Sequence, residues 1–347
     1  MPFRQEPPAA DMAPGRTAVL WCNLGSPDEP TAKAVRPYLA EFLSDPRVVE
    51  IPKAAWMPIL HGIILRTRPA KSAAKYASIW MPEGSPLKVW TQKQATLLRG
   101  WLGERGHRLT VRDAMRYGQP SIASRLDELK AEGVTRVLVL QAYPQYSATT
   151  TASVIDEVNA WSARVRRVPE FRFVNDYHDD TGYIDALARS VVRHWQQNGR
   201  PDQLVMSFHG IPARNIRLGD PYHAQCVVTA RLLAERLQLT PDQYRVTFQS
   251  RFGRAKWLEP YTEPTLRELG AKGIKRVDVM CPGFPADCLE TLEEIAMEGR
   301  EAFLHAGGKE FTYIPCLNDS HDWITALAGI AERHLSGWPT DARARAQ

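Results

Sequence analysis

The sequence has no long apolar run. Its longest apolar stretch, from Trp56 to Leu65, contains a proline, a histidine and a glycine. It is far shorter than the roughly 20 residues that a membrane-spanning helix needs. Residues 1–16 contain no apolar segment of the kind found in signal peptides. We therefore expect a disordered tail over 1–16 and a cytoplasmic protein, with at most peripheral contact at the inner face of a membrane.

Cysteine and strong charge are also scarce. The five cysteines form no Cys-x-x-Cys pair, and their odd number without a secretion signal indicates reduced thiols. This spacing does not favour a structural zinc site. The net charge is only +5, and no dense Lys/Arg run has aromatic residues between its charges, so nothing supports nucleic-acid binding. A mild basic excess suits an anionic small molecule or acidic lipid.

What the sequence does contain is a regular alternation of two kinds of segment. Apolar, β-branched runs predict strands over 17–25, 107–118, 134–144, 203–210, 244–253 and 274–284. Amphipathic segments between them predict helices over 31–44, 86–102, 121–132, 181–197, 286–304 and 319–335. Nearly continuous apolar strands separated by helices are typical of parallel sheets covered on both faces, so we predict an α/β fold.

An internal repeat indicates two similar α/β domains. Residues 121–140 and 261–280 both read as helix, glycine and strand, and their segments AEGVTRVLVL and AKGIKRVDVM share five of ten residues. An accidental likeness between two such units remains open. The repeat predicts domains over 17–155 and 156–318, and a last helix over 319–336 that could pack back on the first domain.

The expected ligand site lies beyond the carboxyl ends of the strands, as in other open α/β sheets. Neither G-x-G-x-x-G nor G-x-x-x-x-G-K-[ST] occurs, so nucleotide binding lacks its usual support. The strand ends carry proline, tyrosine, arginine and aromatic residues, which suit a flat organic ligand.

His209 is the first candidate for chemistry. It ends the apolar stretch LVMSFHGIP (204–212), and Gly210 and Pro212 break the strand directly after it. A neutral imidazole can accept a proton or bind a metal. A histidine at a strand end can equally be a hydrogen-bonded structural residue, and both interpretations are open.

A row of glutamates is the second candidate. Glu290, Glu294 and Glu298 stand at i, i+4 and i+8 and would share one face of the expected helix, although like charges at this spacing repel. A solvated acidic face is the simple explanation. The row follows a strand end and has apolar neighbours, however, which favours a position near a cleft, where carboxylates suit divalent cations. A histidine facing a glutamate is a proton-transfer pair and a two-ligand site for Fe²⁺.

Several long motifs occur together in a characteristic order: CNLGSP (22–27), EGSPLKVWTQKQ (83–94), MRYGQP (115–120), QAYPQYSATTTAS (141–153), SFHGIP (207–212), FQSRFGRAKWLEPYTE (248–263) and CPGFPADCLETLEEI (281–295). Through them the sequence resembles ferrochelatases, which insert Fe²⁺ into protoporphyrin IX in the last step of haem synthesis, from about residue 17 to 335. The resemblance implies the chelatase fold, in which two Rossmann-like domains, each a parallel sheet flanked by helices, enclose a porphyrin cleft.

The resemblance also implies roles for single residues. His209 matches the active-site histidine and Glu290 the carboxylate facing it, both catalytic and both in contact with metal. Glu294 and Glu298 match a carboxylate row that conducts metal or protons, and Asp287 matches an acidic residue that supports the glutamate. The residues expected near the porphyrin are Leu24, Arg116, Tyr117, Tyr143, Tyr146 and Trp257.

Two departures from the family limit this transfer. Cys288 stands where some members have histidine, so no role of a histidine there transfers. The C-terminal GWPTDARARAQ has no cysteine where animal-type members have the ligands of a [2Fe–2S] cluster. We therefore expect no cluster and no permanently bound cofactor, with Fe²⁺ and porphyrin as substrates of a monomer. Residues 42–69 read either as a flexible apolar flap at the pocket mouth or as an ordinary insertion.

Two alternatives stay open at this point. One is a chelatase for coproporphyrin or for another divalent metal. The other is a porphyrin or haem carrier without turnover, which needs an apolar slot and an axial ligand but no facing carboxylate row.

Overall fold

A computed structural model of the chain describes residue 3 and residues 15–253 and 255–340. Contacts divide the chain into two compact units: the first comprises residues 1–142, 148–175 and 327–347, and the second comprises residues 143–147 and 176–326. The expected tail over 1–16 lies outside the described residues except for residues 3, 15 and 16, and Arg16 already begins the first strand.

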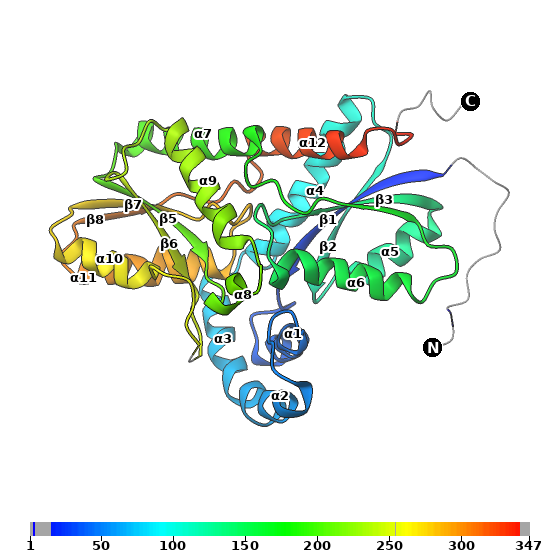
Figure 1. Cartoon of the computed structure of the whole chain (residues 1–347), viewed down its shortest axis with the longest axis horizontal. Helices are drawn as coiled ribbons and strands as arrows, with labels where there is room; N and C mark the ends of the chain where they lie inside the picture. The colour runs from blue at the N-terminus through cyan, green and yellow to red at the C-terminus, as the bar shows by residue number, and fades with distance from the viewer. Residues whose placement is uncertain (1–2, 4–14, 254, 341–347) are drawn as a thin grey trace. The chain divides into compact units, whose positions relative to one another are not determined.

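Each unit contains a four-stranded parallel sheet (Figure 1). The strand order is β2-β1-β3-β4 in the first unit and β6-β5-β7-β8 in the second, so the prediction of two similar α/β domains is confirmed. The strands are β1 Arg16–Gly25, β2 Thr110–Tyr117, β3 Val134–Gln141, β4 Glu170–Phe173, β5 Gln203–His209, β6 Tyr244–Gln249, β7 Arg276–Met280 and β8 Glu310–Tyr313.

Helices connect the strands of each sheet, and in the part of the chain that the structure describes three of the helical segments are π-helical. In Figure 1, α7 and α9 lie together on one face of the second sheet and α10 and α11 on the other. The α-helices are α1 Ala32–Ser44, α2 Lys53–Ile59, α3 Leu65–Ile79, α4 Pro86–Glu104, α5 Ile122–Ala131, α6 Ser153–Ser162, α7 Thr181–Asn198, α8 Ala213–Arg217, α9 Tyr222–Arg236, α10 Thr262–Ala271, α11 Arg300–His305 and α12 His321–Leu335. The π-helices are η1 Leu60–Ile64, η2 Ala148–Ala152 and η3 Glu290–Gly299. Within the described residues, no helix combines the length and the apolar character that crossing a membrane requires.

The internal repeat is visible in the backbone. Gly133 follows α5 and Gly273 follows α10, and both have positive φ angles, 76° and 84°. A left-handed glycine at this place ends a helix and lets the chain turn into the next strand. β3 and β7, the strands that follow, each pair with two neighbours in their own sheet.

Apart from residues 143–147, the chain passes from the first unit to the second after Asn175, whereas the expected boundary lay between 155 and 156. The reason is β4, which pairs with β3 and extends the first sheet beyond residue 155. Residues from Leu327 onward group with the first unit, where Glu332 of α12 forms an ion pair with Arg105 at 2.6 Å.

The cores follow from the apolar strands. In the first unit, β1 is central and its residues Ala18 to Cys22 have no exposed surface. The indole N–H of Trp21 donates a hydrogen bond to Gln94 at 3.1 Å, so this buried polar atom is satisfied. In the second unit, Val205 and Val279 pack with residues of α10, η3 and α11. A strand with both faces buried carries its functional residues at its ends.

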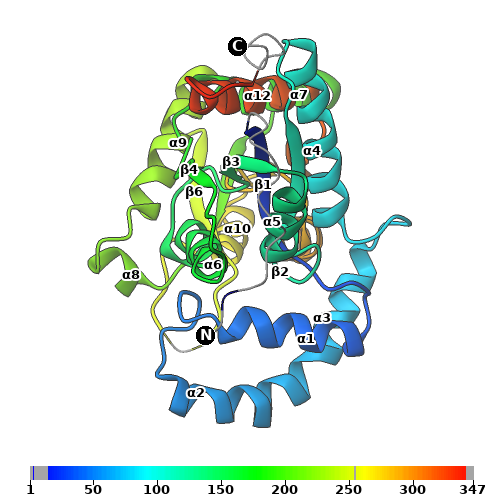
Figure 2. The ribbon, with the colours of Figure 1, turned by 90° about the vertical axis from the view of Figure 1, so that its right-hand side faces the viewer.

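The segment over 42–69 is helical except for residues 45–52. It contains the end of α1, then α2, η1 and the beginning of α3. Figures 1 and 2 both show α1, α2 and α3 side by side within the first unit. Ile59 in α2 and Ile63 in η1 are exposed, and so is Ile51, just before α2.

Candidate functional site

His209 is the last residue of β5 and is half-buried. Its Nδ1 lies 2.6 Å from the carbonyl oxygen of Gly210. Because a carbonyl oxygen can only accept, Nδ1 carries a proton, and in the neutral ring Nε2 holds the lone pair. The rings of Trp257 and Phe284 each lie 6.4 Å from the imidazole between centroids. The structure thus presents one basic nitrogen in an aromatic surrounding.

Gly210 lets the backbone directly after His209 lie close against β6. Its N–H donates to the carbonyl oxygen of Gln249 at 2.8 Å, and a Cβ built on Gly210 would also lie 2.8 Å from that oxygen. No side chain fits there, so the chain after His209 passes directly against β6. Beyond it, Pro212 forms a backbone bridge with Trp257.

The glutamate row lies on a π-helix, and the prediction of one α-helix over 286–304 is wrong in this respect. η3 spans Glu290–Gly299, and α11 begins only at Arg300. Hydrogen bonds from i to i+5 widen the turn, and π-helical segments often occur at functional sites. The spacing of apolar residues in the sequence does not distinguish this π-helix from an α-helix. Within the row, Glu290 and Glu294 are half-buried and Glu298 is exposed.

Glu294 interacts electrostatically with both His209 and Glu290. Burial raises the pKa of Glu294. The Ser250 hydroxyl opposes this rise, and so does the charge that His209 carries once its ring is protonated, while the charge of Glu290 adds to the rise. Glu294 is thus the residue that links the histidine with the other glutamate. An imidazole and two carboxylates so arranged can move protons or hold a divalent ion transiently.

Asp287 anchors the start of η3. This buried carboxylate accepts hydrogen bonds from the hydroxyl of Thr291 at 3.0 Å, the hydroxyl of Tyr313 at 2.6 Å and the amide of Asn318 at 2.6 Å. It therefore ties η3 to β8 and to the loop before α12. Glu290, the first residue of η3, lies three residues further on.

In the first unit, Arg116 and Tyr117 belong to a polar network around Asp45. The guanidinium of Arg116 donates to Asp45 Oδ2 at 2.7 Å and to the hydroxyl of Ser153 at 2.7 Å. Tyr117 has no exposed surface, and its hydroxyl donates to Asp45 at 2.8 Å. Burial by itself would raise the pKa of Asp45, but hydrogen bonds from Ser153, the Arg47 amide and Tyr117, together with the Arg116 charge, lower it overall.

This network makes the stability of the protein depend on Asp45 and on pH. Asp45→Asn is expected to lower the free energy of unfolding by about 3 kcal/mol at neutral pH. Because the folded pKa of Asp45 is lowered, its contribution is complete above the unfolded pKa of about 4 and disappears as the pH falls through the folded value. Urea unfolding at neutral pH and at about pH 3 measures the difference, and an equal difference at both pH values would contradict the assignment.

The other residues expected near a porphyrin are distributed over both units. In the first unit, Leu24 is half-buried near the end of β1. In the second unit, Tyr143 and Tyr146 are half-buried and Trp257 is buried. The backbone N–H of Tyr146 donates to Gln225 at 2.6 Å, which holds its loop on α9.

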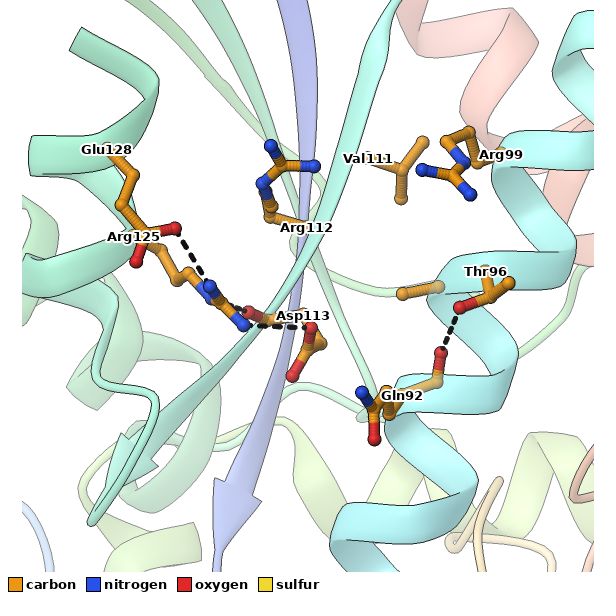
Figure 3. Close-up of a pocket in the computed structure, with 9 residues that line it drawn as sticks. Gln92, Thr96, Arg99, Val111, Arg112, Asp113, Arg125 and Glu128 are labelled. Carbon is orange, nitrogen blue, oxygen red and sulfur yellow. Dashed lines mark hydrogen bonds and ion pairs between the residues drawn. The ribbon is translucent and has the colours of Figure 1, made fainter. Parts of the chain in front are cut away.

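Two further features lie apart from these residues. A pocket of about 330 Å³ opens between α4, β2 and α5 (Figure 3), lined by Gln92, Ala95, Thr96, Arg99, Val111, Arg112, Asp113, Arg125 and Glu128. Its Arg125 is paired with Asp113 and Glu128, and Arg112 is paired with Glu132, so most of its positive charge is neutralised. No residue predicted for the site lines this pocket.

The second feature is a group of possible metal ligands in the second unit. Among the described residues, only Asp176, His178 and Asp179 place three ligand atoms within 4.8 Å of one another. Asp176 already accepts hydrogen bonds from His178 at 3.0 Å and from Gln225 at 3.2 Å. These internal bonds account for the group without an ion.

Comparisons with known proteins agree with the sequence motifs. The sequence profile of the ferrochelatase family matches residues 16–335. A protein named ferrochelatase from Methylibium petroleiphilum is 71% identical over 94% of this chain and 90% of its own length. Another so named, from Polaromonas sp., is 70% identical over 97% of this chain and 91% of its own length. Among solved structures, SirB from Bacillus subtilis with Fe³⁺ aligns with a TM-score of 0.55 at 13% identity, over 92% of this chain and 96% of SirB, which shows a shared fold.

Proposed function

The chain belongs to the ferrochelatase family, and from this premise we propose that it inserts Fe²⁺ into protoporphyrin IX and releases two protons, in the last step of haem biosynthesis. It is thus a lyase-type metal chelatase. The observation that carries the proposal is the orientation of His209, whose Nδ1 is held by the Gly210 carbonyl and whose Nε2 keeps the lone pair. A base is required because two pyrrole protons must leave as the metal enters the ring.

In this mechanism His209 accepts the two pyrrole protons in turn through Nε2, and the first leaves along the glutamate row before the second is taken up. The hydrogen bond from Nδ1 to Gly210 keeps the ring oriented during the transfer, and the carboxylate of Glu294, which interacts with both His209 and Glu290, stabilises the resulting imidazolium. Glu290 assists the transfer or removes water from the incoming ion. Glu294 and Glu298 continue the row toward the exposed end of η3, where an ion or a proton can enter or leave.

The proposed porphyrin contacts are Leu24, Arg116, Tyr143, Tyr146 and Trp257, and Tyr117 is proposed to support them from the interior. A ring that is held bent exposes its nitrogen lone pairs to the metal, and strain of about 1–5 kcal/mol is the general scale for such distortion. Tyr117 contributes through the framework that it builds with Asp45 and Arg116, since it has no exposed surface. Arginine and lysine side chains form ion pairs with the propionate groups of the porphyrin.

We further propose that the protein works without a [2Fe–2S] cluster or another permanent cofactor. Its five cysteines are free thiols, and burial raises the pKa of each of them. The thiolate is the form that binds iron, so these thiols are poor cluster ligands. Free thiols also suit the cytoplasm, which we propose as its location.

Peripheral contact with a membrane is proposed for residues 51–79, which include α2, η1 and α3. Ile51, Ile59 and Ile63 are 44%, 42% and 57% exposed there. No Asp or Glu occurs from residue 51 to residue 82, while five Lys or Arg residues do. Exposed apolar side chains among basic ones are typical of a surface that binds anionic lipid. The protein is proposed to be a monomer, which light scattering can measure.

The test is an anaerobic assay with purified protein, protoporphyrin and Fe²⁺ or Zn²⁺, followed through the metalloporphyrin absorbance. We expect many insertions per protein molecule. Binding of one haem per protein without turnover would identify a carrier instead. A kcat/KM for coproporphyrin above that for protoporphyrin would assign the other porphyrin substrate, and insertion of Zn²⁺ but not Fe²⁺ would reassign the metal.

A further inference from the structure

The end of β6 has an unusual backbone. Ser250, directly after Gln249, has a φ angle of +67°. Residues other than glycine rarely adopt this left-handed conformation. The next residues leave the sheet as a loop. A serine in this conformation must be stabilised by its contacts.

Those contacts go to one carboxylate. The backbone N–H of Ser250 donates to Glu294 Oε1 at 2.6 Å, and its hydroxyl donates to Oε2 at 2.5 Å. The left-handed turn is what points the N–H and the hydroxyl of one residue at the same group. Both oxygens of Glu294 are thereby fixed. Oε2 also accepts a long hydrogen bond from the side-chain amide of Gln249 at 3.4 Å, so Oε1 is the oxygen that keeps a lone pair for another partner.

The preceding residue extends the clamp to the rest of the site. Gln249 is buried; its amide donates to the backbone carbonyl of Glu290 at 2.7 Å and accepts from Ser207 at 2.7 Å. Its own carbonyl accepts from Gly210, next to His209, at 2.8 Å. Two consecutive residues thus connect the histidine strand with both inner glutamates.

We propose that Ser250 is a positioning residue that holds Glu294 ready for the incoming divalent ion. The inference rests on the proposed function. A free glutamate side chain must be ordered when it binds an ion, whereas a clamped one is ordered beforehand. The charged or titratable groups around Glu294 are His209 from β5, Glu290 from η3 and Cys281 after β7.

The decisive variant is Ser250→Gly. It keeps the backbone N–H, removes the hydroxyl and suits the left-handed conformation, so the melting temperature should stay within a few degrees of the wild-type value. We expect the KM for Zn²⁺ or Fe²⁺ to rise several-fold, up to about tenfold, with the KM for porphyrin unchanged. Ser250→Ala should raise the metal KM equally while also losing stability. A loss of folded protein alone would lower kcat and leave both KM values unchanged.

A second measurement separates this inference from the proposed function. Titration of Zn²⁺ into the porphyrin-free protein should show several-fold weaker binding to Ser250→Gly than to wild type. In Glu294→Gln, adding Ser250→Gly should change the metal KM no further. If wild type inserts metal but Ser250→Gly has the wild-type metal KM and Zn²⁺ affinity, the clamp is overturned and the proposed function stands. If wild type inserts no metal, the proposed function fails, and the Zn²⁺ titration still decides on the clamp.

Discussion

Replacing His209 by alanine is expected to lower kcat for metal insertion by about 10²- to 10⁴-fold, the usual contribution of a general base. The variant loses the Nε2 lone pair that the Gly210 carbonyl orients, while the rings of Trp257 and Phe284 remain. The KM for porphyrin should therefore change little. The measurement is initial-rate Zn²⁺ insertion into protoporphyrin, together with porphyrin binding followed by fluorescence quenching.

His305→Ala is the matched control for this variant. His305 is an exposed histidine of the same unit, at the end of α11, and its removal should leave kcat unchanged. Retention of the full insertion rate by His209→Ala would remove His209 from the mechanism. A strong loss of porphyrin binding with unchanged kcat would make it a binding residue instead of a base.

Asp287→Ala should produce the largest loss of stability. The alanine removes the common acceptor of Thr291, Tyr313 and Asn318 and leaves these donors unpaired in the interior. Each unsatisfied buried group costs about 1–3 kcal/mol, so the free energy of unfolding should fall by about 3 kcal/mol or more. Because this network anchors the start of η3, insertion activity should fall even at temperatures where the variant is folded. Urea unfolding and the insertion rate at low temperature measure the two effects.

Two variants control for this result. Asp319→Ala removes an exposed carboxylate in the same loop region and should behave as wild type. Asp287→Asn keeps one acceptor oxygen and should fall between wild type and Asp287→Ala in both measurements. Wild-type stability and activity in Asp287→Ala would show that the carboxylate does not support η3.

Much of the fold follows from local pattern. The six long apolar runs became β1, β2, β3, β5, β6 and β7, because a strand buried on both faces is apolar along its length. β4 and β8 escaped prediction: each has four residues and partly exposed side chains, so neither shows a continuous apolar run. Their pairing depends on β3 and β7, which is tertiary information.

The site divides in the same way. His209 and the glutamates are recognisable because strand ends and row spacing are local features. Gln249 and Ser250 are not, since their importance comes from a left-handed turn and from partners over 40 positions away on η3. The π-helical form of η3 and the anchoring by Asp45 in the first unit likewise depend on packing that no periodicity encodes.

The central claim is that His209 and Glu290 act as one unit. A double-mutant cycle of wild type, His209→Ala, Glu290→Gln and the combined variant, measured as kcat for Zn²⁺ insertion, tests it most directly. If the two residues serve the same proton transfer, the combined variant should be nearly as fast as His209→Ala alone. If the two losses multiply, or if Glu290→Gln inserts metal at the wild-type rate, the paired mechanism is contradicted.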